Sequence, residues 1–310
     1  MPGSPFEILP CPPEARAAAL DLLYRRADEP LRGHLVAAAR DAAQRGGLDL
    51  SGLWIARRRG RVAGALLTQV LAGRTAAVWP PEVEPSWQRA AMAQALLRAA
   101  LEDLRTRGAR IAQALLDPSS PRHAAADLTR AGMPRVTHLI YLRRETSPPL
   151  PLPTSVPRLH WRSYSPETDA EFRAILQATY HDSLDMPELE GVRSLDDILA
   201  GHRAGGRFDP GRWWIGRIPE EPDAAAIVLL SASHNRAAWE VAYLGLTPPA
   251  RGRGLGRATL AYALDLARPH TPRLELAVDA RNRPAEQLYR SAGFLPFDRR
   301  AVYLKVLRGC

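Results

Sequence analysis

A glycine-rich loop separates a strand-like stretch from a helix-like stretch in the last third of the chain. The loop is Arg251-Gly252-Arg253-Gly254-Leu255-Gly256; the apolar stretch Glu240–Leu246 precedes it and the Ala- and Leu-rich stretch Arg257–Ala267 follows it. Glycines let backbone N–H groups approach a ligand without a Cβ in the way, and a helix that begins there adds unpaired amides and the positive end of its dipole. The sequence therefore predicts a phosphate site at the start of this helix.

Two nucleotide-binding loops share this composition but differ in spacing. A Walker loop ends in Gly-Lys-Ser/Thr, whereas Gly256 is followed by Arg257-Ala258. A dinucleotide-binding loop needs the spacing G-x-G-x-x-G and an acidic residue about 20 residues further on. Asp279 is loosely placed for that role, but the glycines have the spacing G-x-G-x-G. Both nucleotide-binding folds are therefore disfavoured.

The segment from Glu240 to Leu307 resembles the GNAT acetyltransferase superfamily. The resemblance rests on Arg-x-x-Gly-x-Gly between strand and helix, a following strand-like stretch Arg273–Val278, then Asn282 and the helix-like stretch Pro284–Ala292. It implies acetyl-CoA as co-substrate and no metal, with the pyrophosphate on the loop amides and the pantetheine between two splayed parallel strands. The donor-binding residues that it implies are Leu244, Leu246, Arg251, Gly252, Arg253, Gly254, Leu255, Gly256, Arg257 and Asn282. For Asn282 the alternative is a cap of the helix that follows it.

The resemblance also implies two catalytic side chains, because an amine that attacks a thioester must lose a proton and the departing thiolate must receive one. Several family members place a glutamate that works through water where Glu240 stands. Strand alternation would put Glu240 on one face with Ala242, Leu244 and Leu246, and a charged side chain is rare on such an apolar face. The alternative to a catalytic role is a solvated glutamate at the start of a strand. Tyr289 stands where the family has the tyrosine that protonates the CoA sulfur; the alternative is a core tyrosine.

An acidic loop follows the helix-like stretch Glu167–Ala178 and is the predicted acceptor region. Residues 180–191 contain four acidic side chains and no basic one, against the trend of the whole chain. Such a loop would attract an amine or a peptide N-terminus, or it would simply be solvated. A metal reading of its His and Asp residues is rejected. The expected acceptor-binding residues are Tyr180, His181, Asp182 and Asp185.

The chain contains a second copy of the same pattern. When Gly132 is aligned with Gly293, the residues before each glycine correspond, and strand-like stretches follow both. Matching segments are Val136–Arg143 with Ala301–Leu307, and the hairpin of Leu53–Ala56 and Val62–Val70 with that of Arg212–Ile218 and Ala224–Ser233. The sequence thus predicts an α/β (α+β) protein with two tandem GNAT domains, each a mixed, mostly antiparallel twisted sheet with helices on both faces.

The two copies differ in their loops. We place an N-terminal GNAT-like domain at 1–145, a Pro-rich extended linker at 146–157 and a C-terminal catalytic domain at 158–310. In the first copy the stretch near Arg89 has no glycine, and Leu128 stands where Tyr289 stands. We interpret the first copy as degenerate, with a structural task. The tandem organisation is similar to that of mycothiol synthases, a likeness that leaves the acceptor open.

Composition limits the other classes of function. The net charge is +9, but only Lys305 of the 42 basic residues is lysine, and the arginines are spread among 33 acidic residues. Aromatic residues are too sparse for a base-stacking platform, so nucleic acid is an unlikely partner. No apolar run spans a membrane, and Cys11 and Cys310 have no metal or redox spacing. We therefore expect a cytoplasmic protein without a membrane partner.

These observations predict an N-acetyltransferase that transfers acetyl from acetyl-CoA to a primary amine of a small metabolite. Two alternatives stay open: a protein or peptide N-terminal acetyltransferase, and a non-catalytic acyl-CoA-binding module. The oligomeric state is also open. A monomer with pseudo-dimeric halves would satisfy internally the contact that single-domain relatives make by dimerising.

Overall fold

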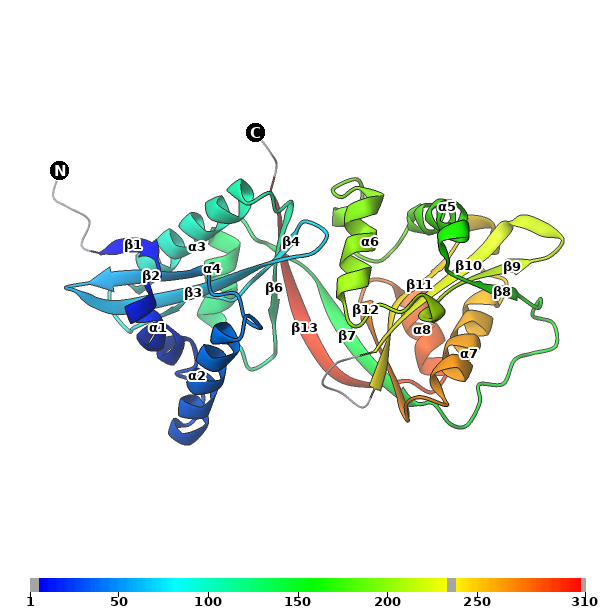
Figure 1. Cartoon of the computed structure of the whole chain (residues 1–310), viewed down its shortest axis with the longest axis horizontal. Helices are drawn as coiled ribbons and strands as arrows, with labels where there is room; N and C mark the ends of the chain where they lie inside the picture. Colours follow the sequence, from blue (N-terminus) through cyan, green and yellow to red (C-terminus); the bar gives the residue numbers. More distant parts are fainter. Residues whose placement is uncertain (1–5, 233–237, 308–310) are drawn as a thin grey trace. The chain divides into compact units, whose positions relative to one another are not determined.

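The computed structural model describes residues 6–232 and 238–307 (Figure 1). The chain divides into two compact units: unit 1 is Met1–Val136 with Ala301–Cys310, and unit 2 is Thr137–Arg300. Each unit combines a twisted sheet with helices, which confirms the predicted fold class. These units differ from the domain limits placed around residues 146–157, which remain a proposal about the sequence repeat.

Unit 1 is built on a mostly antiparallel sheet in which β4 and β6 alone among the described pairs run parallel. Helix α3 packs one face through Met92, Leu96 and Leu104, all with no exposed surface, because its apolar residues recur at helical spacing. Helices α1 and α2 cover the other face. In order across the sheet the strands are β1 (Glu7–Pro10), β2 (Leu53–Arg58), β3 (Arg61–Leu71), β4 (Thr75–Val78), β6 (Ile111–Leu116) and the end of β13 (Leu295–Val306), with β5 (Glu82–Val83) beside β3. The helices are α1 (Arg16–Leu23), α2 (Glu29–Gln44), α3 (Arg89–Thr106) and α4 (Arg122–Arg130).

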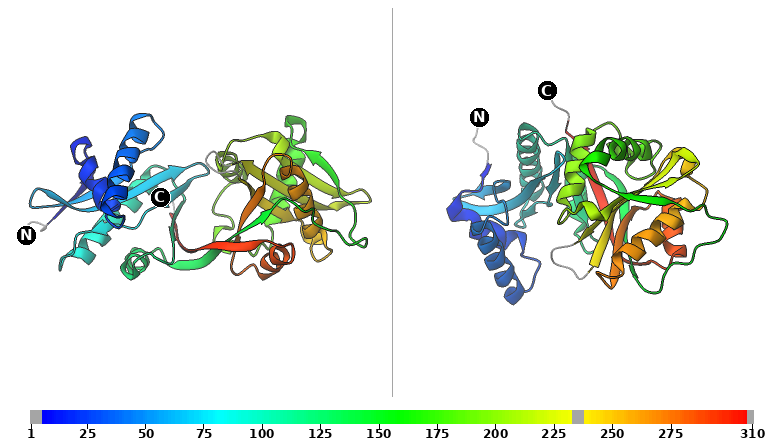
Figure 2. Two further views of the ribbon diagram at one scale, coloured as in Figure 1. Left: turned by 90° about the horizontal axis from the view of Figure 1, so that it is seen from below. Right: turned by 45° about the vertical axis from the view of Figure 1, so that its right-hand side comes forward.

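Unit 2 repeats this plan. Helices α7 and α8 pack one face of its sheet and α5 and α6 pack the other, as the right-hand view in Figure 2 shows. The strand order is β7 (Arg135–Glu145), β12 (Arg273–Asp279), β11 (Ala238–Leu246), β10 (Glu221–Ala232), β9 (Trp213–Ile218) and β8 (His160–Ser163). The helices are α5 (Asp169–Tyr180), α6 (Leu195–Ala204), α7 (Leu255–Ala267) and α8 (Arg283–Ser291).

The last strand of each repeat completes the sheet of the other unit. Strand β7, which follows α4 in the sequence, pairs with β12 of unit 2 from Glu145↔Arg273 to Leu139↔Asp279. Strand β13, which follows α8, pairs with β6 of unit 1 through its residues 301–306. The terminal strands are therefore exchanged between the repeats, an arrangement that the sequence did not predict.

The segment between the repeats has no helix or strand from residue 146 to 159, and it is fixed to unit 2. The Thr146 hydroxyl donates to the Thr271 carbonyl at 2.8 Å, and Leu150 lies in the core beneath α7. Cys11 is a buried free thiol, whereas Cys310 and Ser233 lie outside the described residues. Within the described ranges, no helix combines the length and apolarity needed to cross a membrane.

Candidate active site

The two central parallel strands of unit 2 diverge. Strands β11 and β12 are in register only at Ala238↔Arg273, Trp239↔Leu274 and Glu240↔Glu275. Beyond Glu240, β11 continues to Leu246 and remains paired with β10 on its other side. The second half of β11 therefore borders a gap on the β12 side, as the splayed strands of the resemblance imply.

Two backbone amides point into this gap. The Thr247 amide donates to the Ala225 carbonyl at 3.0 Å and so points toward β10. Because amides alternate along a regular strand, those of Leu246 and Leu244 point away from β10, toward the gap. These are the two amides that the sequence predicted as contacts of an extended donor chain. Their position fits that prediction, since an unpaired strand edge accepts an extended polar chain as a new partner.

The glycine-rich loop adopts a left-handed conformation at two glycines, where φ is +75° at Gly252 and +79° at Gly254. Helix α7 begins at Leu255, directly after the second glycine. None of the successive amides from Gly252 to Gly256 donates to an acceptor among the described residues. Unpaired amides at a helix start together with the helix dipole favour an anion, and the role of this loop in binding phosphate stays a prediction.

The arginine side chains of the loop are used elsewhere. The Arg251 guanidinium donates to the carbonyls of His181 at 2.6 Å and Thr179 at 3.2 Å, just before the acidic loop. Arg253 forms a bidentate ion pair with Glu221, with N–O distances of 2.6 and 2.8 Å. The third side chain, of Arg257, donates to the Pro151 and Ser291 carbonyls. The backbone amides, more than these side chains, are thus the groups that the loop offers to an anion.

Tyr289 lies on α8 in the core of unit 2 and is 7% exposed. Its hydroxyl forms no hydrogen bond with a described residue. Burial raises the pKa of Tyr289 above its usual value, and the nearby Asp185 and Tyr243 raise it further, so the phenol is protonated at neutral pH. Asn282 caps the same helix, because its Oδ1 accepts from the Ala285 amide at 3.2 Å.

The acidic loop is held against the turn between β12 and α8. The Asp185 carboxylate accepts from the Asn282 side chain at 2.8 Å and from the Asp279 amide at 3.1 Å. Glu188 forms a bidentate pair with Arg281 at 2.5 and 2.9 Å, and this guanidinium lowers the pKa of Glu188. Loss of hydration, in contrast, raises the pKa of Asp185. Two of the acids that the sequence offered to an amine therefore also hold the loop in place.

A pocket of about 690 Å³, here called the aromatic pocket, lies between α5, the acidic loop and α6. It contains three of the four predicted acceptor residues, Tyr180, His181 and Asp185; Asp182 is exposed and pairs with His181 at 3.3 Å. The sequence analysis missed Tyr243 from β11 and Arg193. The lining residues are Gln177, Ala178, Tyr180, His181, Ser183, Asp185, Met186, Pro187, Leu189, Glu190, Gly191, Arg193, Leu195, Ile198 and Tyr243.

Hydrogen bonds fix the tyrosines of the aromatic pocket. The Tyr180 hydroxyl lies 3.1 Å from Nε2 of His202, a second residue that the sequence analysis missed. Burial lowers the pKa of His202 to about 4, so its imidazole is neutral at pH 7. The Tyr243 hydroxyl lies 2.9 Å from that of Thr179, and burial raises the pKa of Tyr243 to about 12. Both tyrosines are thus neutral hydrogen-bonding groups at the pocket wall.

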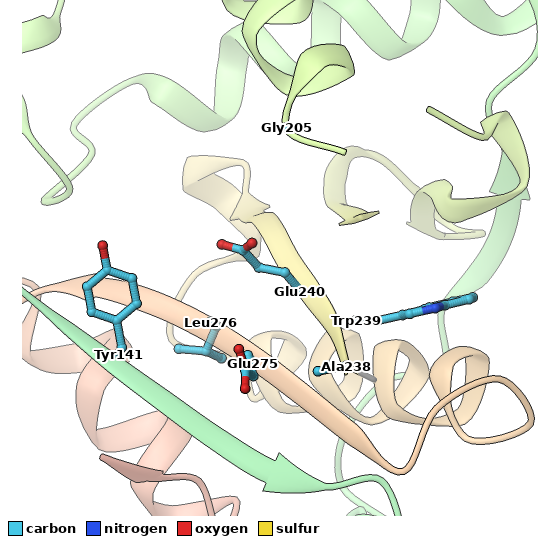
Figure 3. Close-up of a pocket in the computed structure, with 7 residues that line it drawn as sticks. All are labelled: Tyr141, Gly205, Ala238, Trp239, Glu240, Glu275 and Leu276. Carbon is cyan, nitrogen blue, oxygen red and sulfur yellow. The ribbon is translucent and has the colours of Figure 1, made fainter. Parts of the chain in front are cut away.

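Glu240 lies in a different, smaller pocket of about 220 Å³, here called the glutamate pocket (Figure 3). Tyr141 of the exchanged strand β7 and Glu275 of β12 line it together with Glu240. The remaining lining residues are Gly205, Ala238, Trp239 and Leu276. The structure therefore does not place Glu240 in the same pocket as Asp185 and Tyr243. These two are the groups that raise the pKa of Tyr289 further.

The predicted facing of Glu240 is wrong in part. A β-bulge interrupts the register between Leu230↔Val241 and Leu229↔Tyr243. The extra residue, Ala242, shifts the alternation by one position. As a result, Ala242 and Tyr243 both pack toward α5 and α6, whereas Leu244 packs toward α7. Leu244 and Leu246 therefore do not share the face of Glu240.

The corresponding part of unit 1 contains a buried ion pair. Helix α3 begins at Arg89, whose guanidinium pairs with the fully buried Asp127 at 2.7 and 2.8 Å. The backbone from residue 75 to 107 contains no left-handed residue. Leu128, the counterpart of Tyr289, is fully buried in the core. These features support the interpretation of a degenerate first copy.

The chain belongs to the acetyltransferase (GNAT) family, whose sequence model matches residues 19–133 and 167–294. The two matches agree with the two repeats. Among the described residues, no group of three or more His, Cys, Asp or Glu side chains is placed to hold a metal ion.

Mycothiol acetyltransferases are among the similar curated proteins. That of Thermomonospora curvata is 34% identical over 215 residues, which cover 68% of each chain. That of Beutenbergia cavernae is 33% identical over 190 residues, which cover 58% of this chain and 62% of the relative. The chain thus spans about three fifths of the length of the latter relative.

Solved structures share the fold along the whole chain. A GCN5-related N-acetyltransferase from Sphaerobacter thermophilus has a TM-score of 0.60 and 19% identity, with 99% of this chain and 98% of that chain covered. A glucosamine N-acetyltransferase region of a fungal β-N-acetylglucosaminidase also has a TM-score of 0.60, with 16% identity, and covers 98% of this chain and 38% of that one.

Proposed function

We propose that unit 2 transfers an acetyl group from acetyl-CoA to a primary amine of a small metabolite. The observation that carries this proposal is the continuity of the donor site: unpaired loop amides from Gly252 to Gly256 lead to the inward-facing amides of Leu246 and Leu244. A pyrophosphate and an extended pantetheine need these groups in this order. Acetyl-CoA supplies the acetyl group when it is bound there.

Tyr289 is the proposed acid. Its buried hydroxyl keeps its proton at neutral pH, and no described residue occupies it as a hydrogen-bond partner. These are the properties required of a group that gives a proton to a departing thiolate.

Glu240 remains the proposed base, acting through water from the glutamate pocket. Asp185 is a second carboxylate to test, because it lies close enough to Tyr289 to raise the pKa of that phenol. Tyr180 and His181 remain proposed acceptor contacts, since both line the aromatic pocket. Asp182 was proposed with them but does not line this pocket.

The acceptor is proposed to be a small molecule. The aromatic pocket, at about 690 Å³, has the size of a small-molecule site. The relatives named mycothiol acetyltransferases make mycothiol without its acetyl group one acceptor to test, as an amine that carries no anionic group. A cytoplasmic location accompanies this proposal, and unit 1 is proposed to have a structural task.

The test is release of CoA thiol from acetyl-CoA with a panel of small amines and N-terminal peptides. Wild type should turn over at least one small amine, and Tyr289→Phe should lower kcat by about a hundredfold or more with little change in acetyl-CoA affinity. Glu240→Gln and Asp185→Asn should show which of the two carboxylates is the base. The substitution that removes the base should change kcat at low pH, and the other substitution should not.

Two results would reject the proposal. Binding of acetyl-CoA without turnover of any amine, in wild type and Tyr289→Phe alike, would leave an acyl-CoA-binding module. Turnover restricted to peptides would instead favour an N-terminal acetyltransferase.

A further inference from the structure

The aromatic pocket contains a cation for which the described residues provide no partner. Arg193, two residues after the acidic loop, lines this pocket, and its Nε is buried without a hydrogen bond. Its guanidinium forms no hydrogen bond or ion pair with any described residue. Glu190 also lines the pocket but does not pair with Arg193.

Other arginines of unit 2 show that this state is unusual. Arg144, Arg203 and Arg212 also have one buried nitrogen without a partner. Each of them, however, donates from another guanidinium nitrogen, to the Pro148 carbonyl, the Tyr164 hydroxyl and the Arg207 carbonyl respectively. A partly buried guanidinium is costly unless an anion or several acceptors satisfy it. Arg193 is therefore placed to receive such a group from a ligand.

The opposite charge lies in the same pocket, on the side of the proposed acid. Besides burial, Asp185 raises the pKa of Tyr289 and Arg193 lowers the pKa of His202. Both charges also affect the pKa of Tyr180, which Asp185 raises and Arg193 lowers, so Tyr180 lies near both charges. The wall between them is apolar and aromatic, with Tyr243 and Ile198 among its residues.

Building on the proposed function, we infer that the acceptor is an amine that also carries an anionic group, a carboxylate or a phosphate monoester. Its amino group lies toward Asp185 and Tyr289, and its anionic group pairs with the Arg193 guanidinium. The planar fork of a guanidinium binds both kinds of anion in two parallel hydrogen bonds. The aromatic wall accepts an apolar body between the two charged ends.

Matched substrates test this inference. L-phenylalanine is compared with L-phenylalaninamide, and O-phosphoethanolamine with ethanolamine, with rates normalised to the concentration of unprotonated amine. Wild type should prefer the anionic member of at least one pair by about ten- to hundredfold in kcat/KM, the range of a hydrogen-bonded charge pair. The pair that shows the preference identifies the kind of anion.

Arg193→Gln should remove this preference by raising KM for the anionic member at least tenfold more than KM for the neutral member. Arg193→Lys should restore part of it, because the charge remains and the fork is lost. A purely structural role of Arg193 would change both members of a pair equally. Equal use of both members by wild type, or an equal effect of Arg193→Gln on both, would overturn the inference.

A calorimetric measurement separates this inference from the proposed function. Binding of L-phenylalanine and of O-phosphoethanolamine is measured in the presence of CoA, in wild type and in Arg193→Gln. Binding that the substitution weakens at least tenfold supports the anion site even if no amine is acetylated. Absence of binding of both, or binding that the substitution leaves unchanged, overturns the inference even if other amines are acetylated.

Discussion

The loop arginine Arg251 should serve the acceptor side of the site more than the donor. Its guanidinium donates to the carbonyls of His181 at 2.6 Å and Thr179 at 3.2 Å, with longer contacts to Asp182 at 3.4 Å and Leu246 at 3.3 Å. These contacts hold the end of α5, where the acidic loop begins. Without them, an acceptor has to order that loop as it binds.

The size of the effect follows from the two shorter bonds. A hydrogen bond from a charged donor contributes about 1.5–3 kcal/mol, and partial exposure to solvent reduces this. For Arg251→Gln we expect a total loss of about 1.5–3 kcal/mol, which is about a ten- to hundredfold rise in acceptor KM. The dissociation constant of acetyl-CoA should change less than about threefold, because the loop amides remain.

The assay is steady-state kinetics for the acceptor and calorimetry for acetyl-CoA, with thermal unfolding to verify the fold. Arg253→Gln is the matched control: among the described residues its guanidinium pairs only with the half-buried Glu221 and the Pro249 carbonyl, so acceptor KM should not change. The reasoning is refuted if Arg251→Gln weakens acetyl-CoA binding tenfold and leaves acceptor KM unaltered.

Three further substitutions test the site and the fold. Gly254→Ala should weaken acetyl-CoA binding more than Gly252→Ala. Both positions are left-handed, but only the Cβ added at position 254 meets a neighbouring atom, 2.9 Å away. Calorimetry that finds equal losses of affinity for the two variants would contradict this. Leu142→Ala should lower the free energy of unfolding by about 2–5 kcal/mol in denaturant titrations, because Leu142 is fully buried in unit 2, whereas the exposed Leu152→Ala should have little effect. The raised pKa of Asp185 means that the folded state binds its proton more tightly, so this group favours folding at low pH and the benefit is lost as pH rises from the unfolded pKa, near 4, through the folded one. Asp185→Asn should flatten that part of the stability profile, and an unchanged profile would show that Asp185 does not cause it.

Local signals in the sequence were sufficient to predict the strand, loop and helix of the proposed donor site. The strand before Arg251, the glycines and the helix after them are encoded by residues close together in the chain, and the structure has them within a few residues of the predicted bounds. The alternation of Glu240–Leu246 failed because a single bulged residue reverses the facing of all that follow, and no residue type marks that bulge.

The acceptor side depends on contacts between distant residues. Arg193 appeared in the sequence as one arginine among many, and only the packing of α6 against the acidic loop places it in the aromatic pocket. Tyr141 reaches the glutamate pocket because β7 pairs with β12. The sequences of these two strands do not indicate that they pair with each other. Side chains whose place is set by tertiary packing are therefore the ones that sequence reasoning missed.

The exchange of terminal strands has a consequence for the order of folding during synthesis. Unit 1 begins to emerge from the ribosome first, yet its sheet is completed only when residues 301–306 arrive to pair with β6. Until then the edge of β6 carries unpaired backbone groups, which are open to pairing with another chain. In unit 2, by contrast, β7 has already been synthesised when its partner β12 is made. The unit that is translated first is thus the last to be finished, and the exposed β6 edge is the point at which a chaperone would have most to protect.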